Sequence, residues 1–186
     1  MEDREFEFTK KFWAEEILRG NLIWPDGNVI RFAKRNFKPD RSCTVLDYGC
    51  GGGRNSIALA MEGFSCIAMD YNAEALEVVR RKMSERGITN IRLIQNEGFE
   101  VPVEEGSVDA IVASGSLFYN RASDIEKILS NMRKCLKDQG LMWADWRSKS
   151  DSLFRKGEYL EEGLYKLQNG TKREGCCYFF GGSGGD

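Results

Sequence analysis

A glycine-rich turn between a short apolar run and a helix start is the feature that most constrains this chain. Residues 44–46 are Thr-Val-Leu, a partly β-branched run that predicts a buried strand. Asp47 is expected to end it, and glycines at positions 49, 51, 52 and 53 precede a helix expected over residues 55–61. Glycines let the backbone approach a ligand, and free N–H groups at a helix start attract negative groups. The pattern therefore predicts a ligand cradle.

Two familiar glycine motifs fit this turn poorly. The phosphate-binding loop needs Lys-Ser or Lys-Thr after its last glycine, and here Arg54-Asn55 follow, which argues against a nucleoside triphosphate. The dinucleotide fingerprint needs a third glycine at the position of Arg54, so that match is partial. An NAD(P)-dependent oxidoreductase therefore stays open as an alternative, as does a glycine turn with no ligand.

The segment from Asp47 to Asn55, Asp-Tyr-Gly-Cys-Gly-Gly-Gly-Arg-Asn, resembles the first motif of the class I S-adenosylmethionine-dependent methyltransferases, an acid followed by Gly-x-Gly-x-Gly. Its continuation to Ser56 is similar to small members such as the tellurite-resistance-type enzymes. The resemblance implies S-adenosyl-L-methionine as cofactor and S-adenosyl-L-homocysteine as product. It also implies direct in-line methyl transfer to an unidentified acceptor, which we expect to be a small molecule.

Asp70 is the strongest candidate contact outside the turn. It closes a second expected strand, about twenty residues after Gly49, where a carboxylate accepts ribose hydroxyl protons in such folds. An N-cap for the next helix is its alternative role, and the two roles are compatible. Asp47, in contrast, is expected mainly to hold the glycine turn by accepting its N–H groups.

The remaining assignments follow from the resemblance. Glu97 and Gly98 stand where the family binds adenine, although the family's usual residue is Asp. Ser114 begins the loop that binds the methionine end of the cofactor, and aromatic side chains of that loop, at 118 and 119, either line the acceptor pocket or simply pack. The predicted cofactor-binding set is Trp24, Asp47, Gly49, Cys50, Gly51, Arg54, Asn55, Asp70, Tyr71, Glu97, Gly98 and Ser114.

No catalytic residue is assigned. The chain has no histidine, which removes the usual general base, but a thiol, amine or carboxylate acceptor demands none. The absence of histidine also excludes a Cys/His zinc site, the six cysteines form no Cys-x-x-Cys pair, and no metal is expected. A non-catalytic cofactor-binding or partner-binding module remains a further alternative.

Alternating strand and helix patterns predict a Rossmann-like, doubly wound α/β fold, with a mainly parallel sheet and helices on both faces. Strands are expected over residues 44–46, 65–69, 91–95, 110–114 and 141–146, and helices over 10–18, 28–36, 55–61, 73–86 and 124–136. Residues 41–146 would form the S-adenosylmethionine-binding core, preceded by an N-terminal helical lid segment at 1–40 that could carry Trp24 to the cofactor. A hairpin extension at 147–180, with strands at 159–168 and 171–180 around Asn169-Gly170, and a flexible Gly-rich tail at 181–186 would follow.

The family's usual last helix and strand pair have no counterpart in the sequence, so the chain is either truncated or naturally short. The fifth strand is then an exposed edge, which predicts a homodimer. A net charge of −2 gives no nucleic-acid footprint, and neither a membrane-length apolar run nor a signal-peptide core is present. A cytoplasmic location is the default expectation.

Overall fold

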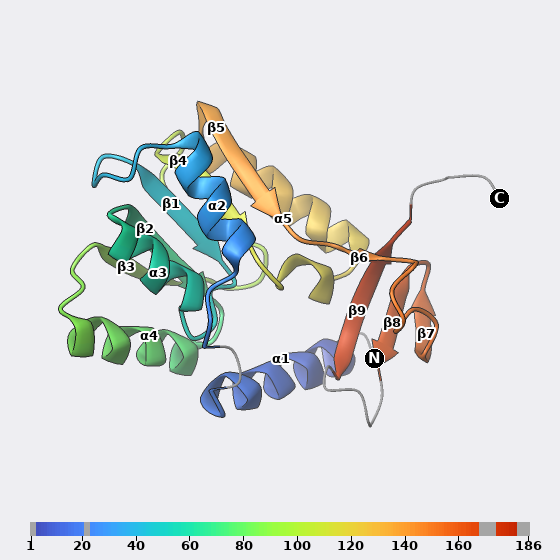
Figure 1. Cartoon of the computed structure of the whole chain (residues 1–186). Coiled ribbons are helices and arrows are strands. Elements are labelled where there is room, and N and C mark those ends of the chain that lie inside the picture. The colour runs from blue at the N-terminus through green and yellow to red at the C-terminus, as the bar shows by residue number, and fades with distance from the viewer. Residues whose placement is uncertain (1–2, 21–22, 168–173, 182–186) are drawn as a thin grey trace.

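A five-stranded parallel sheet forms the centre of the protein. A computed structural model of the chain, which describes residues 3–20, 23–167 and 174–181, gives the strand order β3-β2-β1-β4-β5, and every neighbouring pair is parallel (Figure 1). The strands are β1 (Thr44–Tyr48), β2 (Ser65–Asp70), β3 (Ile91–Gln95), β4 (Val108–Ala113) and β5 (Leu136–Ala144). The order reverses between β1 and β4, and in such sheets ligands bind at the carboxyl ends of the strands at that point. The predicted Rossmann-like α/β fold is confirmed.

Helices cover both faces of this sheet because neighbouring strand residues point to opposite sides. Val45 lies in a core with α2 (Gly27–Asn36), α3 (Arg54–Glu62) and α4 (Ala73–Arg86). Leu46 lies in a second core, on the other face, with α5 (Ala122–Cys135) and the short 3₁₀ helix η1 (Leu117–Tyr119). The sheet is therefore buried on both sides, as parallel sheets usually are.

A smaller sheet and the N-terminal helix stand beside the main sheet. The smaller sheet has the order β6-β9-β8-β7, and its strands are β6 (Arg147–Ser148), β7 (Gly157–Glu161), β8 (Leu164–Leu167) and β9 (Gly175–Phe180). Helix α1 (Asp3–Leu18) contacts β9 at one end and α4 at the other. Figure 1 shows α1 running between the smaller sheet and α4, past the carboxyl ends of the central strands.

Three expected boundaries were wrong because long-range contacts set them. Helix α1 begins at Asp3 and not near position 10, since the smaller sheet supports its first turns. β1 continues through Asp47 because this residue pairs with Ala68 of β2. The stretch 138–140, which separated the helix expected over 124–136 from the strand expected over 141–146, lies inside β5, where the register with β4 shifts between Val108 and Ala110.

The C-terminal hairpin is confirmed in part. β8 and β9 pair antiparallel, with Leu167 opposite Gly175, but the expected turn at 169–170 and the tail at 182–186 lie outside the described residues. The expected strand over 159–168 is instead two antiparallel strands, β7 and β8, because Gly163 (φ 81°) reverses the chain between them. The polar stretch after β5 forms β6, which pairs with β9.

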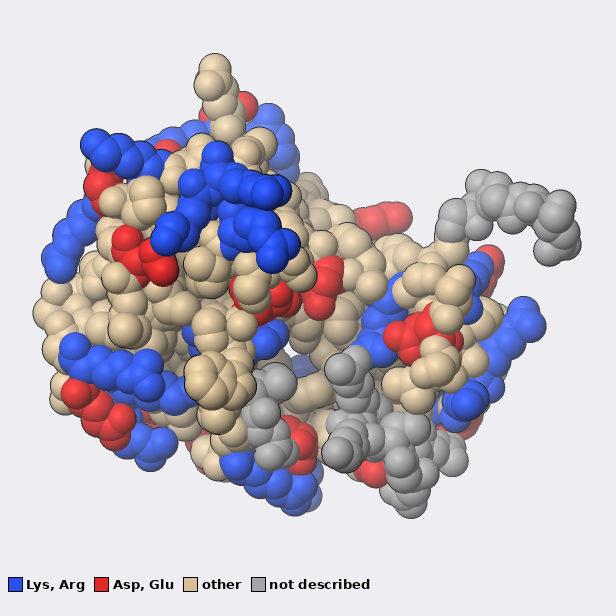
Figure 2. Space-filling model, in the orientation of Figure 1, with Lys and Arg blue, Asp and Glu red and all other residues tan. Residues whose placement is uncertain are grey.

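β5 is the last strand of the main sheet, as the sequence predicted. Figure 2 shows acidic and basic side chains mixed over this face, with a cluster of basic side chains over α2. Within the part of the chain that the structure describes, no helix combines the length and apolarity needed to cross a membrane.

Candidate active site

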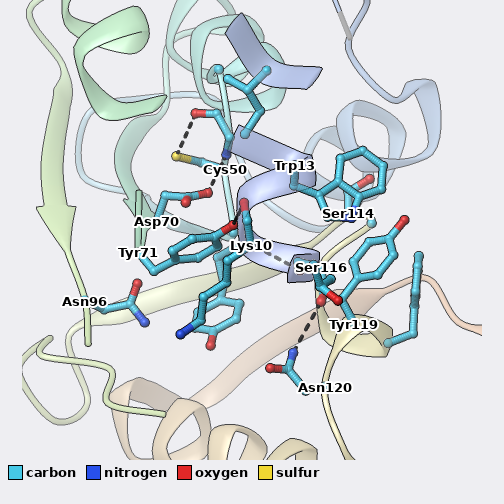
Figure 3. A pocket seen from close by; sticks show the side chains of 18 of the residues that line it. Lys10, Trp13, Cys50, Asp70, Tyr71, Asn96, Ser114, Ser116, Tyr119 and Asn120 are labelled. Atoms are coloured by element: carbon cyan, nitrogen blue, oxygen red, sulfur yellow. Dashed lines mark hydrogen bonds between the residues drawn. The ribbon is translucent and has the colours of Figure 1, made fainter. Parts of the chain in front are cut away.

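A cavity of about 1200 Å³ lies at the carboxyl ends of β1 and β4. Its walls come from the glycine turn, the ends of β2 and β3, the loop after β4, the segment after β5 and helix α1 (Figure 3). Ten of the predicted cofactor residues line it, namely Gly49, Cys50, Gly51, Arg54, Asn55, Asp70, Tyr71, Glu97, Gly98 and Ser114. Asp47 and Trp24 do not line it. Ligand cavities usually measure roughly 300–1,000 Å³, so this one has room for a large ligand.

The glycine turn is fitted closely to its surroundings. Gly49 has φ 67°, and a Cβ there would lie 2.5 Å from the Cβ of Ser116 in the loop after β4. Gly53 has φ 74°, and a Cβ there would lie 2.7 Å from Val79 of α4. Only glycine combines that backbone angle with so close an approach. The two glycines therefore let the turn pack directly against the loop after β4 and against α4.

Asp70 fixes the turn from the end of β2. Its carboxylate is 4% exposed and accepts hydrogen bonds from the backbone N–H groups of Gly51 (2.8 Å) and Asn72 (3.0 Å). Burial raises the pKa of Asp70 above its ordinary value. Its alternative role as helix cap is wrong, because Asn72 caps α4 by accepting from Glu74 and Ala75. The Asp70 carboxylate lies at the cavity wall, beside the turn.

Asp47 has a different role from the one expected. The expected bonds to the glycine turn are made by Asp70, while Asp47 accepts a hydrogen bond from the hydroxyl of Ser56 (2.5 Å) in the first turn of α3. The side chain is 1% exposed, and burial raises the pKa of Asp47 to about 6. Asp47 therefore joins β1 to α3 behind the cavity.

Arg54 links three segments at the cavity edge. Its guanidinium donates to the backbone oxygen of Trp24 (3.2 Å) and to Ser114 Oγ (3.1 Å). Asn55 accepts a hydrogen bond from the backbone N–H of Asp26 (2.9 Å) and is buried. The Trp24 side chain is 78% exposed, so this residue reaches the site through its backbone.

Helix α1 closes the cavity on the side of the glycine turn. The Tyr71 hydroxyl donates to the backbone oxygen of Lys10 (3.1 Å), and the Lys10 ammonium lies 6.0 Å from the Tyr71 ring centroid. Ile17 lies 3.4 Å from the position that a Cβ on Gly51 would take. Tyr71 and Gly51 belong to the predicted set, whereas Lys10 and Ile17 of α1 were not among the residues predicted from the sequence.

Asn96 is the clearest residue that the sequence analysis missed near the expected adenine position. It is 5% exposed, lines the cavity, and donates from its backbone N–H to the Asp70 carbonyl (3.2 Å). Burial raises the pKa of Tyr48 to about 12, and a hydrogen bond with the Asn96 side chain opposes that rise. The neighbouring Glu97 also lines the cavity but is exposed. A polar residue directly after a buried strand was the available signal for Asn96.

Aromatic and charged side chains line the part of the cavity farther from the glycine turn. Trp13 and Tyr119 face each other with ring centroids 4.9 Å apart. The buried indole N–H of Trp13 has no acceptor among the described residues. Arg147 is 8% exposed and pairs with Asp151 (2.6 Å). Only Tyr119 of these was named from the sequence, since the others arrive from α1 and from the segment after β5.

Residues 45–140, more than half of the chain, match the family model described as a methyltransferase domain. This chain belongs to the class I S-adenosylmethionine-dependent methyltransferases. The family's cofactor is S-adenosylmethionine, and the site fits it in three ways: a side-chain-free turn, a buried carboxylate at the end of β2, and a cavity large enough for cofactor and acceptor together.

Individual relatives of this methyltransferase chain are distant. It is 25% identical over 125 residues to YcgJ of Bacillus subtilis, an uncharacterised methyltransferase, which covers 67% of this chain and 49% of that protein. It is 30% identical over 94 residues to the magnesium-protoporphyrin O-methyltransferase of Rhodobacter capsulatus, covering 50% of this chain and 40% of that protein. A solved S-adenosylmethionine-dependent methyltransferase from Methanosarcina mazei superposes with a TM-score of 0.68 at 21% identity, over 80% of this chain and 76% of that one. The chain thus spans less than half the length of the two sequence relatives.

Proposed function

We propose that this chain binds S-adenosylmethionine in the cavity and transfers its methyl group directly to a small-molecule acceptor. The observation that carries the proposal is the buried Asp70 carboxylate, held by the Gly51 N–H at the cavity wall. Each of its oxygens receives one backbone hydrogen bond and keeps a lone pair for a further donor. Vicinal ribose hydroxyls supply two such donors.

The other residues of the site contact the remaining parts of the cofactor. Gly49, Cys50 and Gly51 offer backbone against which the cofactor lies, and the Arg54 guanidinium faces the methionine carboxylate. Asn96, Glu97 and Gly98 form the adenine end, where Asn96 offers a buried side chain and Glu97 an exposed one. Ser114 and Tyr71 also line the cavity wall.

When bound, S-adenosylmethionine supplies a methyl group on a positively charged sulfur, which makes the sulfur a good leaving group. The protein's own task is to align the acceptor with that methyl group and to exclude water. Helix α1 and the smaller sheet serve both purposes, because they enclose the part of the cavity beyond Ser114 and Gly115.

Calorimetry with S-adenosylhomocysteine tests the proposal. We expect micromolar binding to the wild type and a loss of about 1–3 kcal/mol in Asp70→Ala, the usual cost of an unpaired hydrogen-bonded group. Asp70→Asn keeps the side-chain volume and is expected to lose affinity as well. Asp138→Asn, an exposed carboxylate of β5, is the matched control and should bind like the wild type.

Two outcomes would redirect the proposal. A folded wild type that binds NADH and not S-adenosylhomocysteine would favour the oxidoreductase alternative. Arg54 at the third-glycine position and the family match both argue against that alternative. Binding of the cofactor without methyl transfer across a broad acceptor screen would favour a non-catalytic binding module.

A further inference from the structure

The part of the cavity beyond Ser114 and Gly115 has a chemical character of its own. We call it the acceptor half, and its charged and aromatic members are Phe6, Trp13, Phe118, Tyr119, Arg121, Asp124, Asp145, Trp146, Arg147 and Asp151. These side chains come from α1, from the loop and helix after β4, and from the segment after β5. If the proposed function holds, this half receives the methyl acceptor, so its unsatisfied groups indicate the acceptor's chemistry.

The cations of the acceptor half already have carboxylate partners. The ion pairs are Arg147–Asp151 (2.6 Å) and Arg121–Glu161 (2.9 Å). The carboxylate of Asp124 is also paired, with Lys127 (3.1 Å). An anionic acceptor would have to compete with these internal carboxylates. The acceptor half therefore offers no unpaired cation among the described residues.

Asp145 is the charged residue of the acceptor half that has no ion-pair partner among the described residues. It follows the last residue of β5, and its Oδ1 accepts a hydrogen bond from the backbone N–H of Gly115 (2.6 Å). No ion pair to Asp145 occurs within residues 3–20, 23–167 and 174–181. The Gly115 bond fixes the carboxylate beside the loop after β4 and leaves Oδ2 for another partner.

Two aromatic rings of the acceptor half, those of Trp13 and Tyr119, have no cation over their faces within the described residues, and Arg147 reaches only the Tyr119 phenol oxygen. Arg121 lies over Phe6 (5.1 Å) and Arg147 over Phe118 (5.3 Å), but in the described part of the chain no cation lies over Trp13 or Tyr119. Burial raises the pKa of the Tyr119 phenol, Cys177 and the nearby Asp145 carboxylate add to the rise, and the charge and hydrogen bond of Arg147 oppose it. Aromatic faces attract cations, most strongly where water is excluded.

From these contacts we propose that the methyl acceptor is an amine, held with its nitrogen between the Asp145 carboxylate and the rings of Trp13 and Tyr119. The proposal rests on the proposed function. The bound ammonium first releases one proton to solvent water, which frees the nitrogen lone pair. In the transfer, this lone pair forms the bond to the methyl carbon while the bond from that carbon to sulfur breaks. The positive charge passes from sulfur to nitrogen, and the fixed Asp145 carboxylate stabilises it there.

Three probes of one skeleton test the charge preference: 2-phenylethylamine, 2-phenylethanol and 3-phenylpropionate. Each is titrated into the complex of the chain with S-adenosylhomocysteine, with tryptophan fluorescence as the signal, since Trp13 and Trp146 line the acceptor half. We expect the amine to bind at least tenfold more tightly than the alcohol or the acid. Equal affinities, tighter binding of the acid, or no binding of the amine would overturn the proposal.

Asp145→Asn separates charge from structure. The amide oxygen can still accept the Gly115 N–H bond, so the fold should persist while amine affinity falls at least tenfold and alcohol affinity stays unchanged. Asp138→Asn, on the exposed side of the same strand, should match the wild type. An Asp145→Asn variant with undiminished amine affinity would refute the assignment. So would one that weakens S-adenosylhomocysteine instead, because Asp145 would then bind the cofactor's amino group.

The two proposals fail in different ways. Failure of the wild type to bind S-adenosylhomocysteine in calorimetry contradicts the proposed function. The three probes are then titrated into the chain alone, where the same ranking and the same effect of Asp145→Asn decide whether this half selects an amine.

Discussion

The carboxylate of Asp70 accepts a hydrogen bond from the backbone N–H of Gly51 at 2.8 Å, which joins the end of β2 to the glycine turn after β1. The same carboxylate receives the Asn72 N–H, so two loops at the cavity wall share one buried anion. Charge-assisted bonds of this kind are stronger than neutral ones and hold a loop in a single shape. The turn is therefore preorganised before any ligand arrives.

Gly49 and Ser116 are the first pair whose close approach can be tested. Gly49→Ala places a methyl group 2.5 Å from Ser116 Cβ, so it should lower the free energy of unfolding by about 1–3 kcal/mol more than backbone strain alone. Gly106→Ala is the matched control, because Gly106 has φ 62° and nothing within 4 Å of its Cβ position. Urea unfolding measures both. Adding Ser116→Gly to Gly49→Ala should recover part of the loss, and no recovery would mean that the clash is not the cause.

Asp47 should make stability depend on pH. Its pKa is about 6 in the folded chain against 3.8 ordinarily, so the folded state binds more protons between these values. Stability contributed by this group is present below about pH 3.8 and is lost as the pH rises through 6. At 1.36 kcal/mol per pKa unit, the loss is at most about 3 kcal/mol.

Asp47→Asn isolates this effect. The variant keeps an acceptor for the Ser56 hydroxyl and cannot ionise, so its free energy of unfolding relative to wild type should rise between pH 4 and pH 7. Asp138→Asn, exposed on β5, should show a constant difference. Urea unfolding across this range provides the measurement, and parallel curves for wild type and Asp47→Asn would contradict the prediction.

Arg54 should recognise only the amino-acid part of the cofactor. Arg54→Gln is expected to weaken S-adenosylhomocysteine by about tenfold to a hundredfold, the usual range for a charged hydrogen bond. Binding of 5′-methylthioadenosine, which lacks the methionine carboxylate, should change less than twofold. Calorimetry on both ligands gives the ratio, with Arg35→Gln of α2 as an exposed control. An equal loss for both ligands would show that Arg54 acts on the fold and not on the carboxylate.

Thr9 should anchor α1 to the smaller sheet. Its hydroxyl accepts the backbone N–H of Cys176 in β9 (2.8 Å) and donates to the Glu5 carbonyl (2.9 Å), and the residue is 4% exposed. Thr9→Val leaves the buried Cys176 N–H without an acceptor, which should cost about 1–3 kcal/mol. Faster hydrogen exchange of the backbone amides in α1 and β9 of Thr9→Val would show this loss of stability. The amides of Thr9→Ser should exchange at the wild-type rate. Unchanged exchange in Thr9→Val would show that α1 is held by other contacts.

The exposed edge of β5 predicts that two copies of the chain form a homodimer. Leu141 on this strand is 41% exposed, and edge strands present unpaired backbone groups to other chains. Sedimentation velocity should show a concentration-dependent dimer, and Leu141→Lys should shift it toward monomer. A monodisperse monomer at high concentration would count against pairing through this edge.

The sequence by itself determined the elements whose signals are local. The turn at Gly49, the strand ending at Asp70 and the helix from Ala73 to Arg86 each follow from a short pattern, and parallel pairing brings the carboxyl ends of such strands to one edge. By that logic the sequence alone predicts Asp70, Arg54 and Ser114 around one site, and all three line the cavity.

Only the tertiary structure decided which partner each of these side chains takes. Asp47 and Asp70 are both acids at strand ends, and Asp70 holds the glycine turn because it faces Gly51 whereas Asp47 faces Ser56. Trp13 reaches the cavity because α1 packs between β9 and α4, a contact between segments more than 150 residues apart. Local pattern fixes where strands and turns form, but the approach of distant segments is set by packing that no short window of sequence contains.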